Sequence, residues 1–200
     1  MLNQKIRSGW DRLMKPIGRW LARGGLSPDA VTLVGVMLQV AASALILQGR
    51  LLVAGIVATG AGLADVADGA VAKASGRTGR WGAFFDSSTD RLSDALLFGA
   101  LVWLYGVDPD IGSHDEPWVA AVALGTLVVS FLVSYTKARA ESLGYECNVG
   151  IAERAERLII VILGLILDIV PVALIVLAVL ATVTLIQRLV HVRRQEDRAL

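Results

Sequence analysis

The sequence predicts an all-α integral membrane protein with six transmembrane helices, an N-terminal amphipathic helix at the membrane interface and both termini in the cytoplasm. Composition is the first observation: 55% of the 200 residues are hydrophobic and 18% are charged, whereas soluble domains carry about 25% charged residues. The second is that apolar stretches near the roughly 20 residues of a bilayer helix recur along the chain. The third is that basic residues gather in alternate connecting segments. A net charge of +1 gives no bulk attraction to nucleic acid.

The apolar stretches cover nearly the whole chain, which we interpret as one membrane domain over residues 1–200 with a juxtamembrane segment at 1–24. Residues 4–22 place apolar and basic side chains at helical spacing and predict the interfacial helix, bent near Pro16. Asp168 and Pro171 indicate a tight turn between the last two spans. The predicted spans are 31–48, 51–72, 84–105, 117–138, 155–170 and 171–190.

The distribution of Lys and Arg predicts the orientation. These residues lie before the first span, between the second and third, around 137–157, and from Arg188 onward. On the other side Arg50 is the only basic residue, and the 106–116 segment is acidic. Since cytoplasmic loops carry the excess of Lys and Arg, we expect a cell-membrane protein whose functional side faces the cytoplasm. Cys147 is the only cysteine, which excludes an internal disulfide and a multi-cysteine zinc site.

Aspartates within the second and third spans are the main anomaly. Asp65 and Asp68 are three residues apart, and Asp86 and Asp90 are four apart, so each pair projects from one side of its helix. Charges within hydrocarbon are costly and usually face a protein interior or polar cavity. Four converging carboxylates without His or Cys favour a hard divalent cation, Mg²⁺ first, then Mn²⁺ and Ca²⁺, and two pairs suit two ions.

Pairing with arginine, or helix capping, is the alternative interpretation of these acids. It is the favoured one for Asp94, one turn beyond Asp90. The candidate partners are Arg77, Arg80 and Arg91.

The spacing of this region carries a family resemblance. It reads Asp65-x2-Asp68-Gly69-x2-Ala72-Lys73-x8-Gly82-x3-Asp86-x3-Asp90. This resembles the signature of the CDP-alcohol phosphotransferases, membrane enzymes that transfer a phosphatidyl or related group from a CDP-linked donor to an alcohol and release CMP. One position departs from the signature: Lys73 stands where the family has arginine, which keeps a cation but lacks the planar bidentate fork.

Three further segments, 25–35, 134–161 and 186–192, resemble the bacterial phosphatidylinositol phosphate synthases of that family. The resemblance implies transfer of phosphatidate from CDP-diacylglycerol to myo-inositol 3-phosphate. It also implies six spans, a homodimer and dependence on a divalent metal. Within the family the rival acceptor is glycerol 3-phosphate, as in a phosphatidylglycerophosphate synthase, or another polar alcohol.

The resemblance also implies roles for individual residues. Asp65, Asp68, Asp86 and Asp90 hold the metal ions, and Asp90 is the catalytic general base. The CDP donor contacts Asp29, Ala30, Val31, Thr32, Gly69, Lys73, Gly79 and Gly82, with Thr78 as a substitute for a hydroxyl at position 79.

Cationic residues at the predicted cytoplasmic ends of the last three spans suit an acceptor that bears a phosphate. These residues are Lys137, Arg154, Arg157 and Arg188. The alternative is positive-inside topology together with pairing to Glu141, Glu153 and Glu156.

Functions of other classes fit the sequence less well. A cation transporter more often has discontinuous helices near the bilayer midplane, whereas these acids cluster toward one face and adjoin cationic residues. A UbiA-type prenyltransferase is expected to have two separated aspartate motifs and more spans. A non-catalytic membrane scaffold has no use for four converging aspartates.

Overall fold

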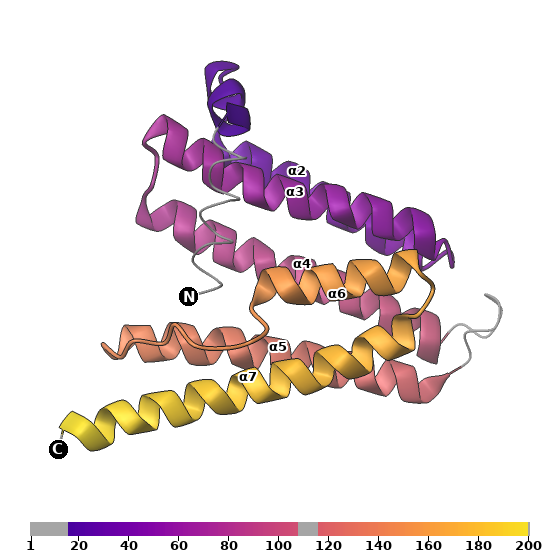
Figure 1. Ribbon diagram of the computed structural model, residues 1–200. Helices are drawn as coiled ribbons and strands as arrows, with labels where there is room; N and C mark the ends of the chain where they lie inside the picture. Colours follow the sequence, from indigo (N-terminus) through magenta and orange to yellow (C-terminus); the bar gives the residue numbers. More distant parts are fainter. Residues whose placement is uncertain (1–15, 108–115, 200) are drawn as a thin grey trace.

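The computed structural model describes residues 16–107 and 116–199, and within them every regular element is a helix (Figure 1). A short helix over 16–23 is followed by α2 (Pro28–Ile46), α3 (Leu51–Ser75), α4 (Arg80–Gly106), α5 (Pro117–Ser142), α6 (Arg154–Ile166) and α7 (Val170–Ala199). Each predicted span corresponds to one of α2–α7. Of the predicted interfacial helix at 4–22, residues 16–22 are helical and the earlier ones lie outside the described residues.

Four helices, α2, α3, α5 and α7, are long and apolar enough to cross a membrane, which supports the predicted membrane protein. The prediction of six spans is not confirmed. The charges near the start of α4 lower its hydropathy although it has 27 residues. The 13 residues of α6 extend over only about 20 Å, less than the roughly 30 Å of a hydrocarbon core.

Local sequence signals explain several helix ends. Ser27 caps α2, its hydroxyl accepting from the backbone N–H of Ala30 at 3.2 Å, and Pro28 occupies the first turn, where its missing N–H costs nothing. Gly76 ends α3 in the left-handed conformation, with φ +67°. Asp168, with φ +54°, lies in the tight turn between α6 and α7, as predicted.

The main core lies where α4, α5, α6 and α7 meet, and Ile46, Leu51 and Ala54 extend it to α2 and α3. Leucines of α4, α6 and α7 fill much of this core: Leu97, Leu101, Leu104, Leu165, Leu174 and Leu177. Helix α2 packs against both α3 and α4, as Figure 1 shows for α2 and α3.

Helix α4 is set apart from two of its neighbours. Among the described residues, no Cα atom of α4 lies within 8 Å of one in α3 or α6. Long and polar side chains therefore bridge these spaces, and they form the candidate site.

Candidate active site

Three of the four motif aspartates converge between α3 and α4. Asp65, Asp68 and Asp86 each offer a carboxylate oxygen, and these oxygens lie within 4.8 Å of one another. Three carboxylates at this separation suit a divalent cation that prefers oxygen ligands. The predicted four-residue metal set is only partly reproduced, because Asp90 lies outside this group.

Asp68 is the most enclosed of the three, with 6% of its surface exposed. The Thr32 hydroxyl donates to Asp68 Oδ2 at 2.6 Å, and the same hydroxyl lies 3.1 Å from the carbonyl of Pro28. Thr32 is one of the residues predicted to contact the CDP donor. Its observed contact orients a carboxylate of the acidic group, the kind of support that metal ligands usually receive.

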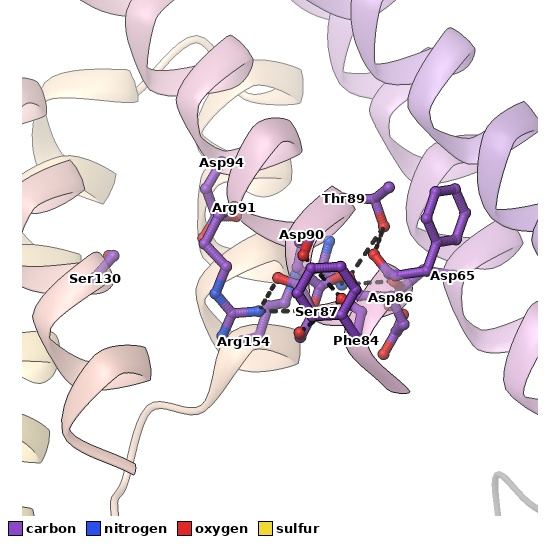
Figure 2. Close-up of polar contacts among 12 residues, drawn as sticks. Asp65, Phe84, Asp86, Ser87, Thr89, Asp90, Arg91, Asp94, Ser130 and Arg154 are labelled. Atoms are coloured by element: carbon purple, nitrogen blue, oxygen red, sulfur yellow. Dashed lines mark hydrogen bonds and ion pairs between the residues drawn. The ribbon is translucent and has the colours of Figure 1, made fainter. Parts of the chain in front are cut away.

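Asp90 lies between two guanidinium groups (Figure 2). Arg154 Nη1 is 2.9 Å from Asp90 Oδ1 and donates to Asp65 Oδ1 at 2.6 Å. Arg91 Nη1 is 3.4 Å from Asp90 Oδ2. Arg154, which begins α6, therefore joins the acids of α3 to those of α4. Among the described residues its Nε is buried without a hydrogen-bond partner, which leaves one donor of this cation unused.

A cavity of about 420 Å³ opens beside the acidic group, with Asp68 and Asp86 in its wall. Six of the eight predicted donor-binding residues line it, namely Asp29, Thr32, Gly69, Lys73, Gly79 and Gly82. A Cβ atom at Gly69 or Gly82 meets nothing within 4 Å, so these glycines face open space. Ala30 and Val31 do not line this cavity; Val31 is buried against Ala67 and Val71.

A second cavity, of about 350 Å³, shares several lining residues with the first and adds Trp81. Trp81 Nε1 donates to Asp29 Oδ2 at 3.2 Å, and its ring stacks on Phe85 with centroids 5.9 Å apart. The residues predicted to bind the CDP donor do not include Trp81. Its place directly before Gly82 of the motif was the available signal.

The four predicted acceptor-binding cations have separate partners. Lys137 lies 3.8 Å from Glu141, the pairing considered as the alternative. Arg157 and Arg188 are 5% and 4% exposed. Arg188 donates to two backbone carbonyls, of Val133 at 2.6 Å and Val149 at 3.0 Å.

The three arginines of this set nevertheless lie near one another. Arg157 and Arg188 donate to the carbonyls of Ser130 and Val133, which are three residues apart on α5, and Arg154 and Arg157 lie one turn apart on α6. Of this set, Arg154 also contacts the acidic group, through Asp65.

In a helical protein with candidate membrane spans, three converging carboxylates beside a cavity suit an enzyme that uses a divalent cation. The sequence model of the CDP-alcohol phosphatidyltransferases matches residues 26–186, and the chain belongs to this family of transferases.

Similar proteins include the phosphatidylinositol phosphate synthase of Streptomyces avermitilis, 41% identical over 100% of this chain and 85% of that protein. A crystal structure of the Mycobacterium tuberculosis phosphatidylinositol phosphate synthase with CDP-DAG bound aligns with a TM-score of 0.80, at 36% identity over 90% of this chain and 94% of the other. A structure of the same enzyme with manganese and citrate aligns with a TM-score of 0.79, at 36% identity over 90% and 88% of the two chains.

Proposed function

We propose that this protein transfers phosphatidate from CDP-diacylglycerol to myo-inositol 3-phosphate and releases CMP. One observation carries the proposal: the acidic group of Asp65, Asp68 and Asp86 lies beside a cavity that six of the predicted donor-binding residues line, and Arg154 of the predicted acceptor-binding cations contacts it. The cavity suits a nucleotide-linked donor and the cations suit a phosphorylated acceptor. The names of the similar proteins support both assignments.

Asp65, Asp68 and Asp86 would hold a divalent metal ion, Mg²⁺ or Mn²⁺, with Asp90 proposed as a ligand of a second ion. Manganese is named for the similar Mycobacterium tuberculosis structure. Such ions neutralise charge on the pyrophosphate and on the departing nucleotide. Thr32 fixes Asp68, and the bridge from Arg154 fixes Asp65 relative to Asp90.

The donor is proposed to lie along the two joined cavities, with its nucleotide toward Trp81 and Asp29. Lys73 lines the cavity that opens beside the acidic group and supplies a cation for a phosphate. Gly69 and Gly82 leave the space that the pyrophosphate needs, because no side chain fills the wall there. The acyl chains stay in the surrounding lipid.

Asp90 is proposed as the general base. It accepts the proton of the attacking inositol hydroxyl, whose oxygen bonds to the lipid-linked phosphorus while the bond from that phosphorus to the CMP oxygen breaks. Arg154 contacts Asp90, and within the described part of the chain its buried Nε–H has no hydrogen-bond partner. Arg154 is therefore proposed to lie where a phosphorylated acceptor and the base meet.

The acceptor phosphate is proposed to bind among Lys137, Arg154, Arg157 and Arg188. Among the described residues, no carboxylate forms an ion pair with Arg188, which donates to two carbonyls. A buried guanidinium without an anionic partner attracts an anionic ligand. We further propose six spans, a homodimer in the cell membrane, and a site that faces the cytoplasm.

The test is CMP release by the purified protein in detergent with CDP-diacylglycerol and Mg²⁺. We expect release with myo-inositol 3-phosphate, little with free inositol, and loss of release with EDTA. Asp90→Asn is expected to lower kcat by about 10²- to 10⁴-fold, the usual contribution of a general base. Asp197→Asn is the matched control, because it removes a carboxylate that pairs with an exposed arginine on α7, Arg193. Turnover with glycerol 3-phosphate alone would reassign the acceptor.

A further inference from the structure

Asp94 is a half-buried carboxylate that the motif and the mechanism leave unused. It lies one helical turn beyond Asp90 on α4, with 16% of its side chain exposed, and it does not belong to the acidic group of Asp65, Asp68 and Asp86. Its ion-pair partner is Arg157 of α6, whose Nη2 lies 3.7 Å from Asp94 Oδ2. Asp94 thus pairs with an arginine, as favoured from sequence, but its partner is Arg157 and not one of the candidates Arg77, Arg80 and Arg91.

Two such pairs, one turn apart, connect α4 with α6. Arg154 lies 2.9 Å from Asp90, and Arg157 lies 3.7 Å from Asp94. Because no Cα atoms of these helices lie within 8 Å of each other among the described residues, the long arginine side chains span the space between them. Figure 2 shows Asp90 and Asp94 on the same side of α4, with Arg154 reaching Asp90.

The two arginines differ in whether a carboxylate accepts a hydrogen bond from their N–H groups. Arg154 Nη1 donates at 2.6 Å to Asp65. The separation of 3.7 Å between Arg157 and Asp94 exceeds hydrogen-bond length, so Asp94 balances the charge of Arg157 without occupying its Nη2–H groups. Arg157 Nη1 donates to the Ser130 carbonyl of α5 at 3.2 Å, which fixes the plane of the guanidinium.

We propose that Asp94 is a positioning residue that holds Arg157 ready to receive the phosphate group of the acceptor. This rests on the proposed function, which places a phosphomonoester among the cationic residues. Arg157 is 5% exposed, and the nearby carboxylate of Asp94 offsets part of the cost of burying its charge. Among the described residues, Asp94 is the one carboxylate that forms an ion pair with Arg157.

The test compares Asp94→Asn and Asp94→Glu with wild type in the purified full-length protein. We expect Asp94→Asn to raise the KM for myo-inositol 3-phosphate about tenfold, the size of a typical coupling between contacting charges, with the KM for CDP-diacylglycerol within about twofold. Asp94→Glu, which keeps the charge, is expected to stay within about threefold for both substrates. Asp197→Asn is the matched loss of an ion pair on the surface of α7 and leaves both constants unchanged.

A direct titration with inorganic phosphate separates this inference from the identity of the acceptor. Weaker phosphate binding in Asp94→Asn supports the positioning role even where wild type releases no CMP with inositol phosphate, a result that would overturn only the proposed function. Equal phosphate affinity in both proteins overturns the positioning role. So does a parallel rise of both KM values with a lower unfolding temperature, since general destabilisation then explains the effect.

A second pair of variants keeps the inference testable if Asp94→Asn does not fold. These are Arg157→Gln and the double variant that combines Arg157→Gln with Asp94→Asn. Both lack the Arg157 guanidinium, so neither contains this buried cation without its carboxylate partner. If Asp94 acts only through Arg157, the two bind phosphate equally. Further weakening in the double variant contradicts the proposal.

Discussion

At the scale of single residues, the hydroxyl of Thr32 has the most specific contact in the site. It donates to Asp68 Oδ2 at 2.6 Å, and Asp68 is the most buried member of the acidic group. The hydroxyl withdraws one lone pair of that carboxylate from other partners and fixes the direction of the remaining ones. From the neighbouring helix α2, Thr32 therefore supports a carboxylate that is proposed to bind metal.

Thr32→Val removes this hydroxyl at nearly constant volume. We expect the affinity for Mn²⁺ to fall about tenfold, as for other residues that orient metal ligands, because Asp68 becomes free to rotate. Titration with Mn²⁺, followed by calorimetry or electron paramagnetic resonance, measures this directly. Thr32→Ser keeps the donor and serves as the control. Equal Mn²⁺ affinities in the Val and Ser variants would show that the hydroxyl does not orient the ligand.

At the scale of elements, the C-terminal turns of α7 fasten the 143–153 segment that joins α5 to α6. The Tyr145 hydroxyl donates to Glu196 Oε2 at 2.5 Å. Gln195 exchanges two hydrogen bonds with the backbone of Glu146, at 3.0 and 2.6 Å. The 30 residues of α7 extend over about 45 Å, so the helix is longer than a bilayer core and its end is available for these contacts.

Cys147 lies within this fastened segment and reports on its opening. The thiol is buried, and burial raises its pKa above the ordinary 9.0. Folding thus favours the protonated thiol: this stabilisation is present below pH 9.0 and is lost as the pH rises through the higher folded-state pKa. Only the thiolate reacts with maleimide, so labelling of the folded protein is expected to be slow at neutral pH and faster in alkali.

Tyr145→Phe removes the hydrogen bond to Glu196 without changing the ring. We expect labelling of Cys147 at pH 7.5 to accelerate several-fold, because the opened fraction of a segment grows as its ties are removed. Tyr135→Phe is the control, since Tyr135 is an exposed tyrosine on α5. The hydrogen bond also raises the pKa of Tyr145, so the tie persists at this pH. Unchanged labelling would place the opening elsewhere.

At the scale of the whole molecule, the features that local sequence patterns determine were predictable. Contacts between residues far apart in the sequence were not. The spacing of Asp65, Asp68 and Asp86 reflects which face of a helix each occupies, and the structure brings the three together. The contact between Asp90 and Arg154 depends on where α6 lies against α4, which no local pattern records.

The same difference applies to the helices. Apolar stretches located the bounds of α2–α7 to within four residues, except that α7 ends nine residues beyond the predicted span, and Asp168 marked the turn before α7. It could not fix how many cross the bilayer. The charges of α4 reduce its apolar character, and α6 is short. In both, the residues that serve the site replace residues that a membrane span normally contains.

The orientation in the membrane is the prediction that concerns the whole chain. Basic residues at both ends of the chain and an acidic 106–116 segment predict cytoplasmic termini, because translocation of Lys and Arg is disfavoured. In a Cys147→Ser background, we expect Ser113→Cys to react with a membrane-impermeant maleimide on intact cells. Arg198→Cys is expected to react only after permeabilisation, which also controls for its reactivity. Labelling of Arg198→Cys on intact cells would invert the topology and place the acidic group on the side without cytoplasmic substrates.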